Sequence, residues 1–232
     1  MTTNTLQLKQ QAADQAVALV QSGMMLGLGS GSTALLALRR LAEMLQTGQL
    51  RDIMGVPTSL QIEQEARRLK LPLTTLEDHP LLDLTIDGAD EVDPNLNLIK
   101  GGGGALLREK IVAQASRREI IIVDASKLAP VLGTRWPVPV EVIPFGWRSQ
   151  AEYIVSLGAQ VTLRQQNGVT FHSDQGNLIL DCHFGPIANA YELAARLKAR
   201  TGIVEHGLFL DLASTVIVAG ADGIRQIDKA SL

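Results

Sequence analysis

The stretch MMLGLGSGSTALLAL, residues 24–38, decides the fold. Its first part is a short apolar run that ends in glycines and hydroxyl residues, and its last part repeats apolar residues at the spacing of a helix. An apolar strand, a glycine-rich turn and a helix in this order are typical of one unit of a parallel α/β sheet.

The same order recurs along the chain on both sides of this stretch. Helices are expected at residues 5–21, 34–46, 57–70 and 105–116, and strands at residues 24–28, 53–56, 81–86, 119–123 and 214–219. Because these aliphatic strands alternate with helices, they predict a parallel sheet covered on both faces.

Residues 133–205 have a different sequence pattern, which predicts a small α+β unit. Three prolines bracket a short strand at residues 140–142, and Asn167-Gly168 is a turn signal between two alternating segments. The other elements expected here are strands at residues 160–164, 169–172 and 178–182 and helices at residues 149–157 and 187–198.

The composition narrows the class of protein. The chain has 232 residues, 46% of them apolar and 19% charged, which is enough apolar material for a core and argues against disorder. A net charge of -3 with only isolated arginine pairs argues against nucleic-acid binding. The single cysteine offers no pattern for a metal site. The start of the chain is polar, and no apolar run approaches the ~18 residues of a membrane span. We therefore expect a soluble cytoplasmic protein without a metal site.

Three loops between a strand and a helix carry unusual chemistry, and such loops lie at the ligand-binding edge of an open α/β sheet. The first is GSGST, residues 29–33. Its glycines allow close backbone approach, and N–H groups at a helix start favour an anion, so it fits a phosphate or sugar cradle. An ordinary strand-to-helix turn with a Ser/Thr cap fits the same residues equally well.

The second loop is DGADEVD, residues 87–93, which places four carboxylates within seven residues. Such carboxylates repel one another unless they face water, bind a cation or share protons. A solvated acidic turn is one alternative and a calcium loop another, although the downstream glutamate of an EF-hand is missing.

The third loop is KGGGG, residues 100–104, and it leads into ALLREK, residues 105–110. Four consecutive glycines are entropically costly unless the backbone must adopt a special conformation. Lys100 adds a positive charge. Glu109 lies little more than a turn into the helix, so its side chain could project toward the same loop; the alternative is that it lies on an ordinary solvated helix face. Together the three loops offer a base, acids, a cation and two anion cradles, an inventory that suits proton transfer beside a carbonyl.

These strings also resemble a known family, ribose-5-phosphate isomerase type A, over nearly the whole chain. The resemblance rests on GSGSTA (29–34), DGADEVD (87–93), KGGGGALLREK (100–110), DASK (124–127), PVEVIP (139–144), GNLILD (176–181) and GIVEHGLF (202–209). It implies a Rossmann-like parallel-sheet domain, residues 1–132 and 206–232, with a small inserted α+β, ferredoxin-like domain at residues 133–205 that helps to close the site and assemble the protein.

The resemblance implies an aldose–ketose isomerase of the pentose phosphate pathway that interconverts ribose 5-phosphate and ribulose 5-phosphate. Glu109 matches the family's proton acceptor, which moves a proton between C2 of the aldose and C1 of the ketose. Asp87 and Asp90 match residues that contact the sugar oxygens and assist ring opening and hydroxyl proton transfer. Lys100 matches a residue whose charge stabilises the enediolate.

The substrate-binding residues implied by the same matches are Ser30, Gly31, Ser32, Thr33, Asp87, Gly88, Ala89, Asp90, Lys100, Gly101, Gly102, Gly103 and Lys127. No metal and no cofactor are implied, and the expected assembly is a homodimer or a homotetramer. Two departures stand out: Ser30 replaces a threonine of many members, and Gly104 replaces an alanine.

Two other functions fit parts of the sequence. A non-catalytic sugar-phosphate-sensing domain of the same fold would bind the ligand without turnover. A nucleotide-dependent oxidoreductase is disfavoured, because a dinucleotide fingerprint starting at Gly27 would need glycine where Ser32 stands, and the second strand ends at Pro57 without an acidic residue.

Overall fold

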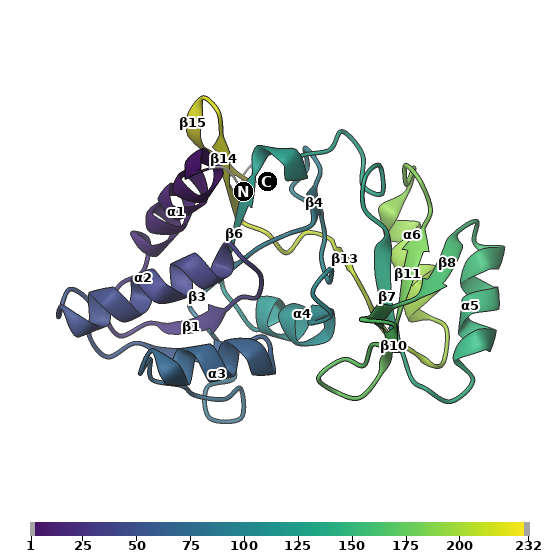
Figure 1. The fold of residues 1–232 in the computed structure, drawn as a ribbon, viewed down its shortest axis with the longest axis horizontal. Coiled ribbons are helices and arrows are strands. Elements are labelled where there is room, and N and C mark those ends of the chain that lie inside the picture. Colours follow the sequence, from purple (N-terminus) through teal and green to yellow (C-terminus); the bar gives the residue numbers. More distant parts are fainter. Residues whose placement is uncertain (1–2, 230–232) are drawn as a thin grey trace. The chain divides into compact units, whose positions relative to one another are not determined.

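The computed structural model describes residues 3–229, and the chain divides into two compact units (Figure 1). The first unit is built from the residues up to 89, residues 108–127 and the residues from 211 onward. The second unit is built from residues 90–107 and 128–210. Among the residues that the structure describes, no helix combines the length and apolar character needed to cross a membrane.

A six-stranded sheet forms the centre of the first unit, in the order β15-β14-β6-β3-β1-β2. All neighbouring strands are parallel except the last pair, β14 and β15, which is antiparallel. The strands are β1 (Met25–Leu28), β2 (Met54–Pro57), β3 (Leu84–Asp87), β6 (Glu119–Asp124), β14 (Thr215–Gly220) and β15 (Gly223–Asp228). The expected parallel α/β sheet is thus confirmed, whereas β15 has too few buried residues to be recognised from its sequence.

Helices cover both faces of this sheet. They are α1 (Thr3–Val17), α2 (Ala34–Gln46), α3 (Leu60–Arg68) and α4 (Leu106–Gln114), with a short 3₁₀ helix, η1 (Ala125–Lys127), after β6. Alternate strand residues such as Leu26 and Ile120 pack with α1 and α2 in one core. On the other face, Val112 of α4 packs with Val56 and Leu82. Two-sided burial explains why inner strands such as β6 and β14 are mostly aliphatic.

Helix ends follow local capping chemistry. Ser59 caps α3 with its hydroxyl, which accepts a hydrogen bond from the N–H of Ile62 at 3.2 Å, as the Thr58-Ser59 pair led us to expect. Helix α1 ends at Val17, ahead of the expected end at residue 21. Gly23, the expected stop, has a φ of 86° and lies in the turn that leads to β1.

The second unit contains a four-stranded antiparallel sheet in the order β12-β7-β11-β8. Its strands are β7 (Val138–Val142), β8 (Gln160–Leu163), β11 (Leu178–His183) and β12 (Ile203–His206), and its helices are α5 (Trp147–Ser156) and α6 (Ala190–Lys198). Alternate residues of β7, such as Val140, pack against Ile154 of α5 and Leu197 of α6. The expected small α+β unit is therefore present.

A hairpin projects from this sheet. It joins β9 (Gln165–Gln166) to β10 (Val169–Thr170), which is shorter than the strand expected at residues 169–172. Asn167 and Gly168 have φ values of 54° and 78°, the left-handed pair that a tight two-residue hairpin turn requires. The turn signal was therefore correct, and only the strand length differs.

A three-stranded sheet, in the order β13-β5-β4, changes the boundary between the units. Its strands are β4 (Glu91–Val92), β5 (Leu98–Ile99) and β13 (Leu208–Phe209). Because β5 pairs with β13, residues 90–107 belong to the second unit, which also extends to residue 210. The boundaries expected at residues 133 and 205 rest on composition alone, which carries no information about this strand pairing.

Candidate active site

Asp87, at the end of β3, is the organising residue of the site in the first unit. Its side chain is fully buried, and its Oδ1 accepts hydrogen bonds from the N–H of Ser30 at 2.9 Å and of Gly88 at 2.7 Å. Gly29 permits this approach, because a Cβ on residue 29 would lie 2.4 Å from the Asp87 Cα. The first glycine loop thus cradles a carboxylate that comes from the second loop.

The Ser30 side chain belongs to a cluster of hydroxyl groups. Its Oγ lies 2.8 Å from Thr58 Oγ1 and 3.0 Å from Ser59 Oγ. The N–H of Ser30 is taken by Asp87, but within residues 3–229 the N–H groups of residues 31–34 donate to no acceptor. These groups, at the start of α2, can therefore donate to an anion.

Lys9 of α1 belongs to the same neighbourhood, although it lies outside every motif of the three loops. Its Nζ lies 3.5 Å from Ser32 Oγ and 3.4 Å from Asp124 Oδ2, and the residue is 8% exposed. A signal existed: Lys9 precedes the buried Ala12 and Ala13 by three and four positions, so it lies on the buried face of its helix. A lysine in an apolar stripe usually has a charged partner or a ligand.

The partner of Lys9 is held in its charged form. Burial raises the pKa of the Asp124 carboxyl, but hydrogen bonds from Ser126 and the positive charge of Lys9 outweigh burial and hold that pKa below its usual value. Asp124 ends β6 and η1 follows directly, which places Lys127 at the same carboxyl edge of the sheet. Lys127 is half-buried.

Glu109 reaches the site from α4 and is 6% exposed. It precedes Val112 by three positions, so the two share one helix face. A Cβ on Gly27 would lie 1.8 Å from Thr85 Oγ1 and 2.6 Å from Val112 Cγ1, so Thr85 and Val112 occupy the same side of the sheet. Asp87 points to that side as well, because side chains two apart on a strand share a face.

The direction of α4 completes this placement. The carbonyl of Ala115, which follows the last turn of α4, accepts a hydrogen bond at 2.8 Å from the N–H of Leu82, just before β3, so Glu109 lies farther toward the carboxyl end of β3, where Asp87 stands. The structure therefore brings Glu109 and Asp87 to the same edge and the same face of the first sheet.

The second unit contains Asp90, Lys100 and the glycine loop. Lys100 follows β5 and is 2% exposed, with its Nζ 5.5 Å from the centre of the Phe209 ring. The N–H of Gly102 donates to Asp90 Oδ2 at 2.7 Å. Gly101 and Gly104 have φ values of 103° and 84°, so two of the four glycines are needed for a left-handed backbone.

The candidate residues thus form two groups. The first unit holds Ser30, Gly31, Ser32, Thr33, Asp87, Gly88, Ala89, Glu109 and Lys127, and the second unit holds Asp90, Lys100, Gly101, Gly102 and Gly103. Asp87 and Asp90 stand only three positions apart in the sequence, and so a single short segment carries an acid of each group.

Several known proteins are closely similar to this chain in sequence. The family model described as ribose 5-phosphate isomerase A (phosphoriboisomerase A) matches residues 54–223. The ribose-5-phosphate isomerase A of Chloroflexus aurantiacus is 58% identical over 227 residues, which cover 97% of this chain and 95% of that protein. The enzyme of the same name from Desulfatibacillum aliphaticivorans is 54% identical over 224 residues, covering 96% of this chain and 97% of its own.

Solved structures agree in fold. A D-ribose-5-phosphate isomerase in complex with phospho-erythronic acid has a TM-score of 0.94 and 38% identity, covering 96% of this chain and 98% of that one. The ribose 5-phosphate isomerase of Plasmodium falciparum has a TM-score of 0.94 and 42% identity, covering 97% and 99%. With this match of sequence and fold over nearly its whole length, the chain belongs to the ribose 5-phosphate isomerase A family.

Proposed function

We infer that this family member interconverts ribose 5-phosphate and ribulose 5-phosphate, and we propose that Glu109, Asp87, Asp90 and Lys100 act on one bound substrate molecule. The observation that carries the proposal is burial: Asp87 is 0% exposed, Glu109 6% and Lys100 2%. Burying ionisable groups costs free energy, so three of them within one short stretch of sequence point to a catalytic use.

The reaction is a transfer of one proton between neighbouring carbons. Glu109, as a carboxylate, removes the proton from C2 of the open-chain aldose, and the electron pair of the C–H bond forms the C1–C2 double bond of an enediolate. Protonated Glu109 then returns the proton to C1. The proton on the C2 oxygen leaves and the C1 oxygen gains one, which yields the ketose without any net redox change.

Lys100 and the two aspartates act on the oxygens. The ammonium group of Lys100 stabilises the negative oxygen that develops next to the double bond, an effect that is large in a buried site. Asp87 and Asp90 exchange protons with the sugar hydroxyls and assist ring opening. Asp87 is suited to hold one position, because two backbone N–H groups fix its Oδ1.

The phosphate group is assigned to the first glycine loop and Lys127. The N–H groups of residues 31–34 and the hydroxyl of Ser32 are suited to an anion, and Lys9 adds a positive charge beside Ser32. One solved relative is a complex with phospho-erythronic acid, which likewise carries a phosphate.

Removing the Ser59 hydroxyl tests the link between this loop and its support. Ser59→Ala is expected to cost about 1 kcal/mol of stability as a lost cap, and to raise KM about fivefold because Ser30 loses a hydrogen-bond partner. Urea denaturation and initial rates measure the two effects. Asn189→Ala removes the matching cap of α6, where Asn189 accepts from the N–H of Glu192 at 3.1 Å. That variant is expected to lose similar stability with an unchanged KM, and equal KM values for both variants would contradict the assignment.

The pair Asp87 and Asp93 tests the proposed roles in the acidic loop. Asp87→Asn is expected to lower kcat about tenfold to a hundredfold, since it cannot exchange protons with the substrate. Asp93 instead accepts hydrogen bonds from the N–H groups of Asn95 and Asn97, as in a structural turn. Asp93→Asn is expected to keep kcat, and full turnover by Asp87→Asn would remove Asp87 from the mechanism.

The sensing alternative has no support among the relatives, which are named as isomerases.

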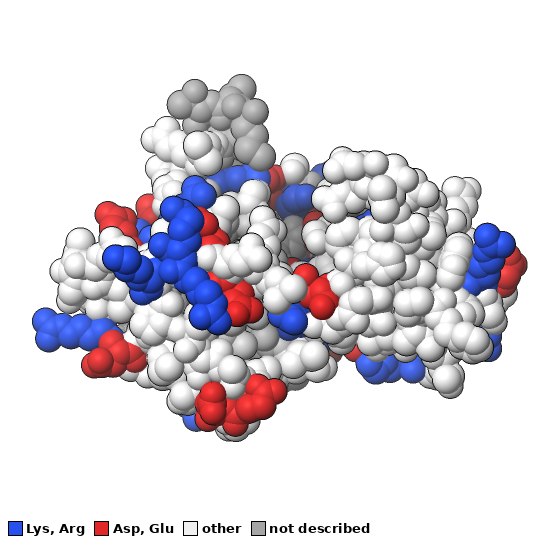
Figure 2. Space-filling view, turned by 60° about the horizontal axis from the view of Figure 1, so that its bottom comes forward, with Lys and Arg blue, Asp and Glu red and all other residues white. Residues whose placement is uncertain are grey.

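We also propose that the enzyme is cytoplasmic, metal-independent and a homodimer. Figure 2 shows a broad face of the second unit on which most side chains are uncharged, and Phe145 of that unit is 88% exposed. Phe145 is apolar, and exposed apolar side chains on a face with few charges favour an oligomer contact. Light scattering after size-exclusion chromatography measures the mass, and a monomer at micromolar concentration would contradict the dimer.

A further inference from the structure

One peptide group of the tetraglycine loop is held at both ends. The carbonyl of Gly101 accepts a hydrogen bond from Arg164 Nη1 at 2.7 Å, and the N–H of Gly102 donates to Asp90 Oδ2 at 2.7 Å. Both groups belong to the peptide that joins residues 101 and 102. A guanidinium thus stands on one side of this peptide and a carboxylate on the other.

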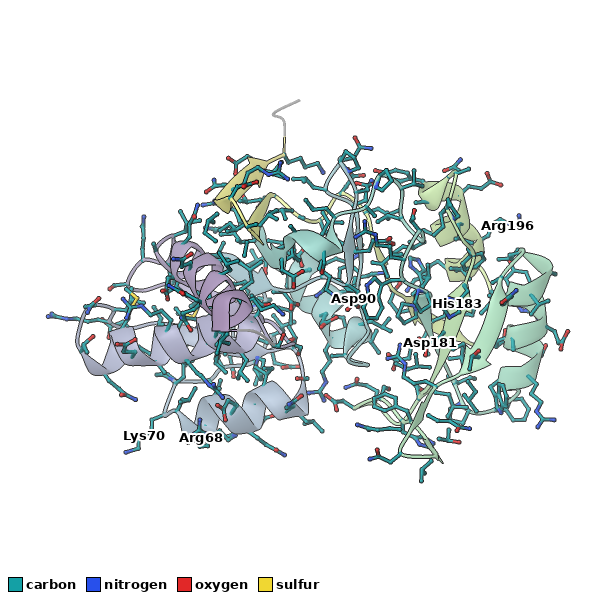
Figure 3. The ribbon with its side chains drawn as sticks, turned by 45° about the horizontal axis from the view of Figure 1, so that its top comes forward. Arg68, Lys70, Asp90, Asp181, His183 and Arg196 are labelled. Carbon is teal, nitrogen blue, oxygen red and sulfur yellow. The ribbon has the colours of Figure 1, made fainter. Side chains whose placement is uncertain are left out.

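Arg164 itself is fixed by several contacts within the second unit. Its Nε donates to Asp181 Oδ2 at 3.0 Å and its Nη2 to Asp181 Oδ1, a two-point ion pair. Its Nη1 also reaches the carbonyl of Gly102 at 3.2 Å, and its side chain is 13% exposed. Figure 3 labels Asp181 on β11 and Asp90 near β4. Asp181 pairs with Arg164, and Asp90 accepts the hydrogen bond from the 101–102 peptide.

The ring of Phe171 lies close to both Arg164 and Gly104. The Arg164 guanidinium lies 5.9 Å from the centre of the Phe171 ring. A Cβ on Gly104 would lie 2.4 Å from Phe171 Cζ. The ring therefore occupies the space that a side chain at residue 104 would need, and the fourth glycine of the loop and Phe171 form a matched pair.

The chain of contacts has a physical consequence for Asp90. Hydrogen bonds linked in series polarise one another, so a cation at the Gly101 carbonyl strengthens the hydrogen bond that the Gly102 N–H donates. Glycine backbone is also conformationally free, and a loop of four glycines presents an N–H in one direction only when other groups hold it.

We propose that Arg164 is a positioning residue for the isomerase reaction, acting on Asp90 through the 101–102 peptide. It sets the direction and strength of the hydrogen bond to the Asp90 carboxylate, and Asp181 and Phe171 hold the guanidinium in place. The inference rests on the proposed role of Asp90 in the reaction.

Kinetics of four proteins test it: the wild type, Arg164→Gln, Asp90→Asn and the double variant. Arg164→Gln is expected to lower kcat about tenfold to a hundredfold, since a misplaced group costs rate on this scale, with a smaller change in KM. Because both residues act through one carboxylate, the double variant is expected to be no slower than Asp90→Asn. Losses that multiply in the double variant would overturn the proposal.

Matched variants separate this role from simple stability. Arg200 is also partly buried in the second unit, but it donates to Gln150 and Ser149 and stacks on Tyr153. Arg200→Gln is therefore expected to keep the wild-type kcat. Arg164→Lys keeps the charge but cannot bridge Asp181 and both carbonyls, so its kcat is expected to lie between those of the wild type and Arg164→Gln.

The outcomes are distinguishable. If circular dichroism shows that Arg164→Gln does not fold, the kcat of Arg164→Lys becomes the test. A wild-type kcat in Arg164→Lys overturns the proposal. Full turnover by Asp90→Asn would remove Asp90 from the mechanism and the inference with it. Loss of turnover in Asp90→Asn beside an unaffected Arg164→Gln would leave the proposed function standing and overturn the role of Arg164 alone.

Discussion

Replacing Glu109 with glutamine is expected to lower kcat by about 10²–10⁴-fold, the usual contribution of a positioned general base. Glutamine has nearly the shape of glutamate but cannot take up a proton from C2. Since Glu109 is 6% exposed on α4 and the change keeps its volume, the variant is expected to remain folded and to bind the sugar phosphate. Initial rates and a binding titration measure the two quantities.

Glu119 provides the matched control. It is a second buried glutamate of the first unit, 1% exposed, but it begins β6 and so lies at the amino edge of the sheet, opposite the ligand-binding edge. Glu119→Gln is expected to keep the wild-type kcat per folded molecule. A Glu109→Gln protein with nearly full turnover would show that another group removes the proton.

Replacing Lys100 with methionine is expected to lower kcat about 10²–10³-fold, the loss seen when one stabilising donor is removed from a developing oxyanion. Methionine fills a similar volume and keeps the contact with the Phe209 ring, so packing around β5 and β13 is expected to survive. The charge of Lys100 acts on the enediolate and less on the substrate. KM is therefore expected to change less than kcat.

Lys198 gives the comparison for this variant. It pairs with Glu205 at 2.6 Å on the surface of the second unit, with its side chain 59% exposed. Lys198→Met removes one positive charge from the same unit and is expected to leave kcat unchanged. Equal losses in the two variants would mean that kcat responds to the charge of the unit rather than to an ammonium group at the reacting oxygens.

The parallel sheet and its helices could be predicted because their signals are local. An aliphatic strand such as residues 119–123 is buried on both faces, and helix 34–46 has its apolar residues at helical spacing, so neither depends on distant partners. The acidic and glycine-rich loops could be found for the same reason, since their residue types are rare in ordinary turns.

Pairing between distant segments could not be predicted in the same way. The pairing of Leu98–Ile99 with Leu208–Phe209 assigns residues 90–107 to the second unit, and no pattern within either dipeptide indicates it. Arg164 lies far in sequence from the loop whose carbonyls it contacts, and a lone arginine between two short strands has many ordinary explanations. Lys9 was detectable in principle through its place on a buried helix face.

The measurement that tests the central claim most directly is the turnover of ribose 5-phosphate by the wild-type chain in excess EDTA, followed by the appearance of ribulose 5-phosphate. A metal-independent isomerase is predicted to form the ketose at the same rate with and without the chelator. Binding of the sugar phosphate without any turnover, in either condition, would contradict the account, and the chain would then share the sequence and fold of the family but not its activity.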